Sequence, residues 1–253
     1  MKMHVLSGGR LRMRRRVYIP EAAKDETIDL PVACFLLRHS QGNVLFDTGC
    51  HPDTATDPVG RWGGMAKMMT LVSPARDNLI DNLAAIGVGV DDVDVVINSH
   101  FHTDHCGCNA FFRRATVVCH AREVEAASAP DAVQAGFADA DWKHPNRFDT
   151  FEAQKDLFGD GRIVVLPLPG HTQGMSGALV ALERSGPYLL ASDAVALRVN
   201  LERDQNPRQT WNPDLATKSM AEIRRIEAGG ATIVFGHDLA QWETLKKGAD
   251  AYD

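Results

Sequence analysis

The stretch NSHFHTDHCG, residues 98–107, places three histidines and one aspartate within six positions, directly behind the apolar run VDVVI. Side chains two residues apart on an extended chain point to the same side, so His100 and His102 can converge on one ion. If the chain then turns into a helix, Asp104 and His105 face a neighbouring point. Imidazole and carboxylate groups suit zinc and similar metals without any thiol. The stretch therefore predicts a metal site rather than a histidine-rich polar turn.

Three later residues share this context, because each lies just past the end of a strand-like run. VVLPLPGHTQG supplies His171, YLLASDA supplies Asp193 and TIVFGHD supplies His237. A single residue of this kind usually caps a helix or stabilises a turn. Their joint occurrence at the same kind of position makes one shared site at a sheet edge the simpler interpretation.

Seven candidate ligands are too many for one catalytic zinc ion, which takes three protein ligands and a water, but they are enough for two ions. One hypothesis places His100, His102 and His171 on a first metal, Asp104, His105 and His237 on a second, and Asp193 between them. Two metals about 3.5–4 Å apart can share a hydroxide and polarise a carbonyl or phosphoryl oxygen. The pattern predicts hydrolysis, with Asp104 and Asp193 as the catalytic carboxylates.

The composition limits the partners that we expect. The 253 residues are 44% hydrophobic and carry a formal net charge of -6, which argues against nucleic acid as a partner. The basic run RLRMRRR at 10–16 is interpreted as a solvated strand or hairpin. No run approaches the roughly 18 apolar residues of a membrane span, and the basic N-terminus lacks the apolar core of a signal peptide. We therefore expect no membrane association.

The cysteines predict a cytoplasmic protein. Their odd number and irregular spacing do not fit the disulfide framework of a secreted protein. The five are Cys34, Cys50, Cys106, Cys108 and Cys119. Cys106 and Cys108, which follow the histidine cluster, are interpreted as small buried residues rather than ligands, since free cysteine packs as a small hydrophobe.

Strand-like and helical runs in both halves of the chain predict an α/β protein. The strand-like runs are HVLSG (4–8), RRVYI (15–19), LPVACFLLRH (30–39), GNVLFDTG (42–49), VDVVINSH (93–100), ATVVCH (115–120), GRIVVLPLPGH (161–171), SGALVALE (176–183), GPYLLASDA (186–194) and ATIVFGHD (231–238). Helical spacing occupies 75–87, 121–129 and 212–230, while 57–74 reads as a long irregular loop. This order of strand-like and helical runs predicts two sheets packed face to face with helices outside, in one domain of two similar halves.

The motif H-x-H-x-D-H at 100–105, followed by His171, Asp193 and His237, resembles the metallo-β-lactamase superfamily. The resemblance covers essentially the whole chain, and we expect 1–253 to be a single domain of that type. It implies a four-layer αβ/βα sandwich with two mixed sheets and the metals at one edge. Two Zn²⁺ per chain are expected, although manganese, iron and cobalt accept overlapping ligand sets. In that family the aspartate of FDTG, here Asp47, supports the metal site from behind the ligands.

Within the superfamily, the order of motifs resembles the N-acyl homoserine lactonases and the related pyridoxolactonase. That resemblance implies a metal-bridging hydroxide that attacks a lactone carbonyl, most simply in quorum quenching. Two positions depart from it. The lactonases carry a tyrosine where this chain has Ala196, and a bulky apolar residue where it has Thr103. Tyr18 and Tyr188 lie at the wrong distance along the chain to be assumed as substitutes.

The loop at 57–74 is a candidate substrate pocket, because rigid scaffolds commonly carry specificity on loops. Trp62, Met65, Met68 and Met69 line an apolar acyl pocket in this hypothesis, together with Thr103 and Ala196 near the metals. An equally acceptable interpretation has Trp62 and the methionines cover the core or contact another subunit. A monomer and a homodimer both remain open.

Other functions are compatible with the same metal centre. The enzymatic alternatives are a thioesterase of the glyoxalase II type and a hydrolase of other esters, amides or phosphoesters. A flavodiiron-like redox protein fits less well, because such proteins place an acid where His102 stands. The non-enzyme alternative is an inactive metal-binding fold, against which the intact ligand set argues.

Overall fold

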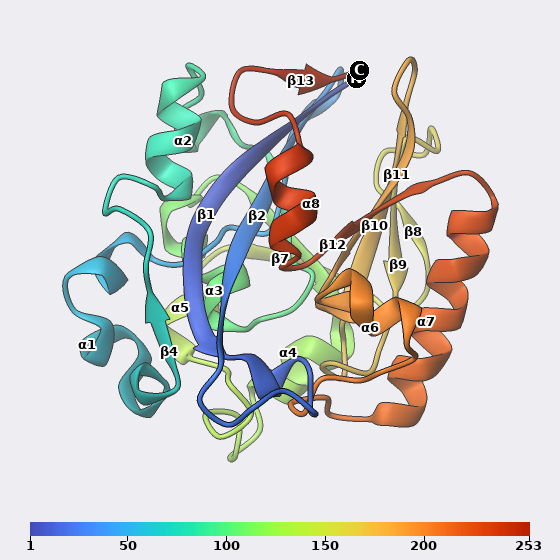
Figure 1. The fold of residues 1–253 in the computed structure, drawn as a ribbon. Helices are drawn as coiled ribbons and strands as arrows, with labels where there is room; N and C mark the ends of the chain where they lie inside the picture. The colour runs from blue at the N-terminus through green and yellow to red at the C-terminus, as the bar shows by residue number, and fades with distance from the viewer.

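The computed structural model describes residues 1–253 as two β-sheets packed face to face, with helices on both outer sides (Figure 1). The larger sheet runs β13 (Ala251–Tyr252), β1 (Lys2–Arg14), β2 (Thr27–His39), β3 (Gly42–Phe46), β5 (Val95–Ile97), β6 (Thr116–His120) and β7 (Arg147–Phe151), and β4 (Met69–Leu71) also pairs with β1. The smaller sheet runs β12 (Thr232–Phe235), β11 (Gly186–Ser192), β10 (Ser176–Leu182), β9 (Ile163–Pro167) and β8 (Lys155–Asp156).

Both sheets are mixed, as predicted. In the larger sheet β1, β2 and β3 are antiparallel neighbours, whereas β3, β5, β6 and β7 run parallel. In the smaller sheet only β11 and β12 are parallel. The helices are α1 (Pro58–Trp62), α2 (Leu79–Ala85), α3 (Thr103–Cys106), α4 (Ala121–Ala127), α5 (Asp139–Trp142), α6 (Arg198–Glu202), α7 (Pro213–Ala228) and α8 (Leu239–Thr244).

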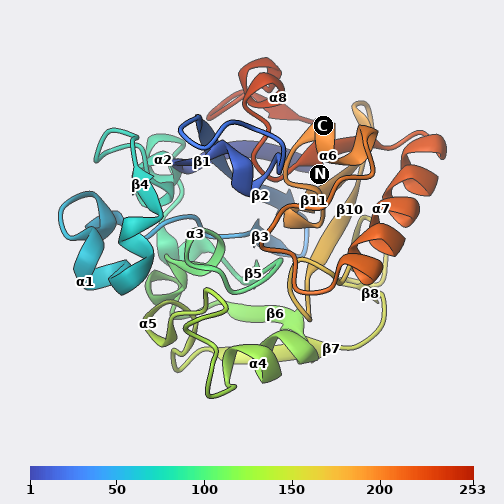
Figure 2. The same ribbon diagram turned by 60° about the horizontal axis from the view of Figure 1, so that its bottom comes forward.

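Three apolar clusters hold the layers together. The largest lies between the sheets and joins side chains such as Phe46 and Leu37 of the larger sheet to Val165 and Leu190 of the smaller one. A second cluster packs α2 against the outer face of the larger sheet, and a third packs α7 against the outer face of the smaller sheet. Figures 1 and 2 show α2 and α7 on opposite outer sides, which completes the four-layer αβ/βα order expected from the resemblance.

Helix α7 forms where its local signals coincide. The side chain of Asn212 accepts a hydrogen bond from the backbone N–H of Leu215, and Pro213 occupies the first turn, where its missing N–H costs nothing. Buried residues recur at helical spacing and face the smaller sheet: Ala216, Ser219, Met220, Ile223 and Ile226. Asn212 is therefore the N-cap of α7, at the first residue of the helical spacing identified at 212–230.

Two local predictions were wrong. RRVYI does not form a strand, because pairing of β1 with β2 ends at Arg14 and the chain then makes a 3₁₀ turn at Arg15–Val17. Its apolar residues Tyr18 and Ile19 are buried beneath the cavity described below instead of in a sheet. The segment 57–74 is also more ordered than an irregular loop, since it contains α1, a 3₁₀ turn at Gly63–Lys67 and strand β4.

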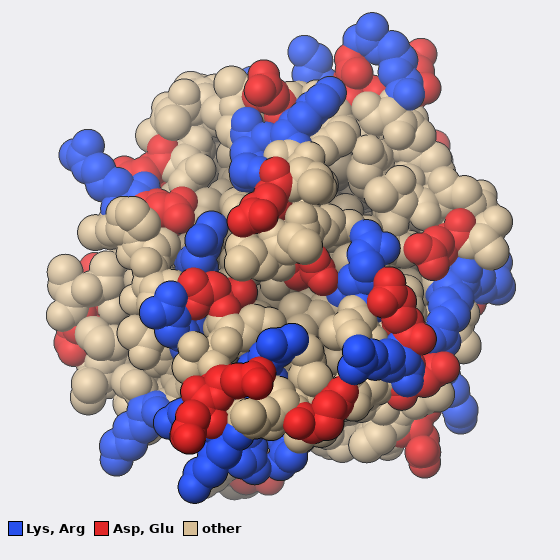
Figure 3. Space-filling view, viewed as in Figure 1, with Lys and Arg blue, Asp and Glu red and all other residues tan.

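The surface carries mixed charge. On the face seen in Figure 3, lysine and arginine side chains are interspersed with aspartate and glutamate. Arg12 of the basic run 10–16 is part of this pattern, because its guanidinium makes two hydrogen bonds to the Asp29 carboxylate, at 2.6 and 2.8 Å. None of the helices combines the length and the apolar character needed to cross a membrane.

The fold gathers the ends of several strands at one edge. Asp47 follows β3, the segment 98–105 follows β5, Asp193 follows β11 and His237 follows β12. Because β3 and β5 are parallel, as are β11 and β12, each pair delivers its carboxyl ends to the same place. The opening between the two sheets at this edge is the position of the candidate site.

Close backbone packing beside this edge requires glycine at position 49. Gly49 has a φ of 72°, and a Cβ there would lie 2.5 Å from the Cα of Gly8. We predict that Gly49→Ala lowers the free energy of unfolding by more than about 1 kcal/mol, through strain and a backbone collision. Chemical denaturation measures this. Gly64→Ala is the control, because a Cβ at Gly64 meets nothing within 4 Å; equal stability losses in the two variants would contradict the prediction.

Candidate metal centre

The histidine-rich stretch has the local conformation that its spacing predicted. After β5 the chain bends at Ser99 and stays non-helical to His102, whose backbone is extended with φ -69° and ψ 152°. Helix α3 then begins at Thr103, so Asp104 and His105 lie in its first turn. The change from extended chain to helix directs the two pairs of side chains to neighbouring points.

Three histidine nitrogens form the first group of donors. Nδ1 of His102 lies 3.1 Å from Nε2 of His100 and 3.0 Å from Nε2 of His171. The opposite nitrogen of His102, Nε2, lies 3.0 Å from the carbonyl oxygen of Ala135, to which it donates as an N–H. Nδ1 of His102 is then a bare acceptor, and a cation between the three rings would relieve the repulsion among their lone pairs.

The second group combines two histidines with the Asp104 carboxylate. Nδ1 of His105 donates to Asp47 at 2.9 Å, and Nδ1 of His237 donates to the carbonyl of Pro31 at 2.9 Å. These bonds fix the tautomers and leave both Nε2 atoms facing inward. Asp104 Oδ2 lies 3.4 Å from Nε2 of His105 and 3.6 Å from Nε2 of His237.

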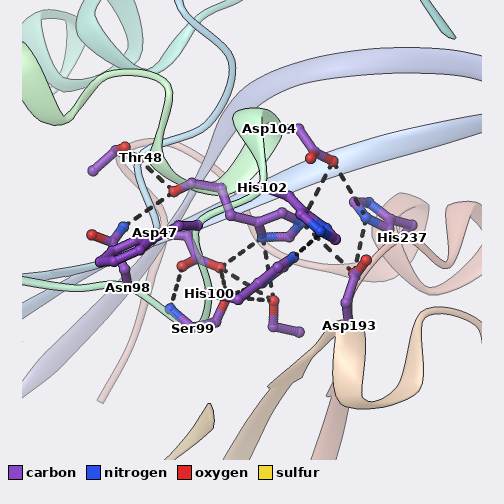
Figure 4. A network of polar contacts seen from close by, with 12 residues as sticks. Asp47, Thr48, Asn98, Ser99, His100, His102, Asp104, Asp193 and His237 are labelled. Atoms are coloured by element: carbon purple, nitrogen blue, oxygen red, sulfur yellow. Dashed lines mark hydrogen bonds and ion pairs between the residues drawn. The ribbon is translucent and has the colours of Figure 1, made fainter. Parts of the chain in front are cut away.

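Asp193 lies between the two groups. Its Oδ1 is 3.0 Å from Nε2 of His237 and 3.7 Å from Nε2 of His105, whereas its Oδ2 is 3.3 Å from Nε2 of His171. Figure 4 shows His237 between the carboxylates of Asp104 and Asp193. One carboxylate oxygen thus faces each group of donors, which is the arrangement of a bridging ligand.

The unsatisfied atoms of this cluster fit a metal centre. Nε2 of His105, Nε2 of His237 and Oδ1 of Asp193 are all buried without a hydrogen-bond partner. Leaving such groups unpaired costs about 1–3 kcal/mol each. Divalent cations bound by these nitrogen and oxygen donors would satisfy all three atoms. The donor set, without thiolate, is one that zinc and neighbouring transition metals accept.

The electrostatics keep His100, His171 and Asp104 in their metal-binding forms. Around His105 and His237 the neighbouring carboxylates outweigh burial and raise the pKa of both imidazoles. Burial lowers the pKa of His171 to about 3, and it also lowers the pKa of His100. Burial opposes ionisation of Asp104, but the imidazoles of His105 and His237 outweigh it and lower the Asp104 pKa to about 2. Neutral imidazole and ionised carboxylate are the states that bind metal.

Asp47 connects three of the segments that carry ligands. Its carboxylate accepts hydrogen bonds from the backbone N–H of Ser99 at 2.7 Å, the Ser99 hydroxyl at 2.8 Å and the ring of His105 at 2.9 Å. Ser192, which precedes Asp193, also donates to it at 3.2 Å. Asp47 and Ser192 both adopt positive φ angles, 59° and 46°, as strained residues at functional sites often do.

Glu123 is a buried carboxylate that our sequence reasoning missed. It accepts hydrogen bonds from the backbone N–H of Phe101, the hydroxyl of Thr172 and the backbone N–H of Gly174, at 3.0, 2.8 and 2.9 Å. Burial raises its pKa to about 7. Glu123 joins the segment of His100 and His102 to the loop that follows His171. Its sequence context is an ordinary short helix, which gives no signal of this role.

A cavity of about 440 Å³ opens beside the donors. His102, Asp104, His171 and Asp193 form its polar end. Its remaining wall includes Trp62, Met65, Met68, Met69 and Thr103. The predicted pocket residues of segment 57–74 therefore line a cavity beside the metal donors. The buried hydroxyl of Thr103 has no hydrogen-bond partner.

Ala196 is placed differently from the prediction. It is 1% exposed, belongs to the apolar cluster that also contains Trp62 and Tyr18, and does not line the cavity. Tyr18 does line it, and its ring lies 6.1 Å from the ring of His237 in an edge-to-face arrangement. The position of Tyr18 along the chain did not predict its place at the cavity, because the turn after β1 folds back towards the site. The five cysteines are buried and unpaired, as interpreted from the sequence.

Two mixed sheets that meet at an edge with seven histidine and aspartate donors define the class of metal-dependent hydrolases. The chain belongs to the metallo-beta-lactamase superfamily, whose family model matches residues 27–237. That superfamily binds divalent metal ions, and the donor geometry described above agrees with this.

Relatives and solved structures of this superfamily resemble the whole chain. The N-acyl homoserine lactonase AttM of Azorhizobium caulinodans is 30% identical over 100% of this chain and 99% of its own length. An N-acyl homoserine lactonase of a Bacillus species is 29% identical over 95% and 94% of the two chains. A solved N-acyl homoserine lactone hydrolase, with N-hexanoyl-L-homoserine at its catalytic metal centre, superposes with a TM-score of 0.89 at 23% identity and covers 99% of this chain and 98% of its own. The last comparison supports the fold.

The bond between Asp47 and His105 predicts a specific effect on metal binding. Asp47→Asn should weaken metal affinity roughly 10–100-fold, because loss of the carboxylate lowers the basicity and the alignment of His105. Competition with a chromogenic chelator measures this affinity. The matched control is Asp160→Asn, which removes a carboxylate 2.8 Å from His39, outside the site. An unchanged metal affinity in Asp47→Asn would show that metal binding does not depend on the hydrogen bond between Asp47 and His105.

Proposed function

We propose that the protein is a dinuclear metal-dependent lactonase that opens N-acyl homoserine lactones, as in quorum quenching. The observation that carries the proposal is a cluster of donors, split into two groups with a carboxylate between them, at the polar end of a largely apolar cavity. The relatives named above act on this substrate class. The proposed ligands are His100, His102, Asp104, His105, His171, Asp193 and His237, and we propose two zinc ions per chain.

The chain's own residues supply positioning and proton transfer. Bound divalent ions would provide a nucleophile at neutral pH and polarise the substrate carbonyl. The Asp104 carboxylate lies at the polar end of the cavity, where it can accept a proton from the attacking water and return it to the ring oxygen that leaves. Asp193 holds the two groups of donors at a fixed separation. Asp47 and Glu123 keep the donor segments in place.

The cavity favours a substrate with an apolar arm. Methionine side chains adapt to flexible aliphatic groups, and Met65, Met68 and Met69 face the cavity together with Trp62. An acyl chain extending away from the metals would lie against this wall. Met68 is 56% exposed and belongs to the entrance. We propose that the substrate enters there, whether the protein acts as a monomer or as a homodimer.

Metal analysis followed by a substrate panel tests the proposal. We expect close to two transition-metal ions per chain, and turnover of acyl homoserine lactones above that of thioesters, β-lactams and phosphodiesters. Asp104→Asn is the matched negative control and should lose at least about 100-fold in kcat/KM, since several kcal/mol of transition-state stabilisation depend on the site. Strong thioester turnover without lactone turnover would instead favour the thioesterase alternative. A metal content near zero would remove the basis of the proposal.

The apolar wall predicts a dependence on acyl-chain length. Met65→Gln keeps the length of the side chain but adds a polar amide, which should raise KM roughly tenfold for a decanoyl lactone, for a loss of about 1.4 kcal/mol of apolar contact. KM for a butanoyl lactone should change less than twofold. Val59→Gln serves as the control, because Val59 is 67% exposed and does not line the cavity. Equal changes for the long and short substrates would place the acyl chain elsewhere.

A further inference from the structure

The Tyr18 hydroxyl at the site is still without a role. The chain has three tyrosines, and of these only Tyr18 lines the cavity that contains Asp104 and Asp193. Tyr18 is 6% exposed, and its ring packs edge-to-face with the ring of His237. It therefore lies against one of the proposed metal ligands, on the same cavity as the reacting groups.

The position of Tyr18 is held by contacts from a distant part of the chain. The side chain of the buried Asn200 donates to the backbone carbonyl of Tyr18 at 2.9 Å. The backbone N–H of Arg208 donates to the carbonyl of Val17 at 2.7 Å, and the guanidinium of Arg208 donates to the carbonyl of Pro20 at 2.9 Å. These bonds fasten the turn after β1 to the segment that follows Asp193. Tyr18 is thus a fixed part of the wall.

The Tyr18 hydroxyl could donate to a stronger hydrogen-bond acceptor than the one it contacts in this structure. Its O–H donates to the thioether sulfur of Met13 at 3.6 Å, and thioether sulfur is a weak acceptor. Buried tyrosine hydroxyls normally have a stronger partner. A carbonyl oxygen entering the cavity would be such a partner, especially as negative charge develops on it. Burial, together with the carboxylates of Asp193 and Asp104, raises the pKa of the Tyr18 hydroxyl above its ordinary value, so the hydroxyl keeps its proton and can donate a hydrogen bond.

Residue 196 leaves room for Tyr18. Tyr18 and Ala196 belong to the same apolar cluster, in which Ala196 contributes only a methyl group. The backbone carbonyl of Ala196 accepts a hydrogen bond from the N–H of His237 at 2.8 Å, so this segment runs directly beside the proposed ligand. A large side chain at 196 would compete with the phenol ring of Tyr18 for the same cluster.

We propose that Tyr18 is a catalytic residue whose hydroxyl donates a hydrogen bond to the carbonyl oxygen of the lactone. The inference rests on the proposed function. As a water-derived oxygen bonds to the carbonyl carbon, the π electron pair moves onto the carbonyl oxygen, which Tyr18 stabilises. The pair returns when the bond from that carbon to the ring oxygen breaks, and the ring oxygen takes the proton held by Asp104. Tyr18 keeps its own proton throughout, and the net reaction adds one water molecule to the lactone.

Tyr18→Phe tests this assignment while it keeps the ring against His237. We expect kcat/KM for the lactone to fall about 10²–10³-fold, the loss typical of one oxyanion donor, and the effect to lie mainly in kcat. Metal content and the thermal unfolding midpoint should match those of the unaltered protein. Calorimetry with the ring-opened acyl homoserine should show less than a tenfold change in Kd. Tyr188→Phe is the matched control, since Tyr188 lies on β11 against Tyr252 and away from the cavity.

The possible results separate this inference from the proposed function. A Tyr18→Phe variant that retains full metal and lactone turnover within twofold would overturn the role of Tyr18 and leave the lactonase proposal intact. A variant that loses metal would also overturn it, because Tyr18 would then support the ligands instead of the substrate. If the unaltered protein opens no lactone but cleaves another ester, the proposed function fails. The same comparison on that ester then supports or overturns the contact of Tyr18 with the carbonyl.

Discussion

The buried carboxylate of Asp47 is the constraint on which the arrangement of the site depends. A single negative charge, 1% exposed, is surrounded by donors from Ser99 after β5, His105 in α3 and Ser192 at the end of β11. An unpaired charge in that position would be costly, so the three segments must stay together for the charge to be satisfied. The energetic cost of burying the Asp47 charge without these donors keeps the adjoining edges of the two sheets together. Four of the proposed ligands share this precision, because His105 contacts Asp47 directly and His100, Asp104 and Asp193 each adjoin a residue that does.

The fold and the donor cluster could be anticipated from the sequence because their signals are local. A buried strand followed by alternating histidines can be recognised from ten residues, and helix α7 from the helical spacing at 212–230. The strand predicted at RRVYI failed for a physical reason: apolar residues occur there because they cover a cavity, and burial beneath a cavity has the same sequence signature as burial in a sheet. Strand β4 was not predicted because its three residues are too few to show the alternation of apolar and polar side chains typical of a strand.

The remaining features of the site depend on contacts between distant segments. Glu123 looks like any acid of a short helix, and only the approach of Gly174, where a Cβ would lie 2.4 Å from the Glu123 backbone nitrogen, brings its carboxylate to the ligand loops. Tyr18 and Asn200 are 182 positions apart and still share a hydrogen bond. Neither relation leaves a pattern in the order of residues, since both are set by how segments far apart in the chain pack at the edge of the sandwich.

The cavity wall and the metal donors come from separate segments of the chain. Leu11, Met13 and Tyr18, the segment 62–69 and the loop 133–136 form most of the wall, whereas the donors follow β5, β9, β11 and β12. Apart from Ala135, whose carbonyl accepts from His102, and Tyr18, which packs against His237, the wall segments can accumulate substitutions without disturbing the donors. Proteins that share all seven donors can therefore diverge in the molecules they admit. Agreement at the donor positions alone is consequently weak evidence for a shared substrate, and exchange of the wall segments between relatives offers a direct route to altered selectivity.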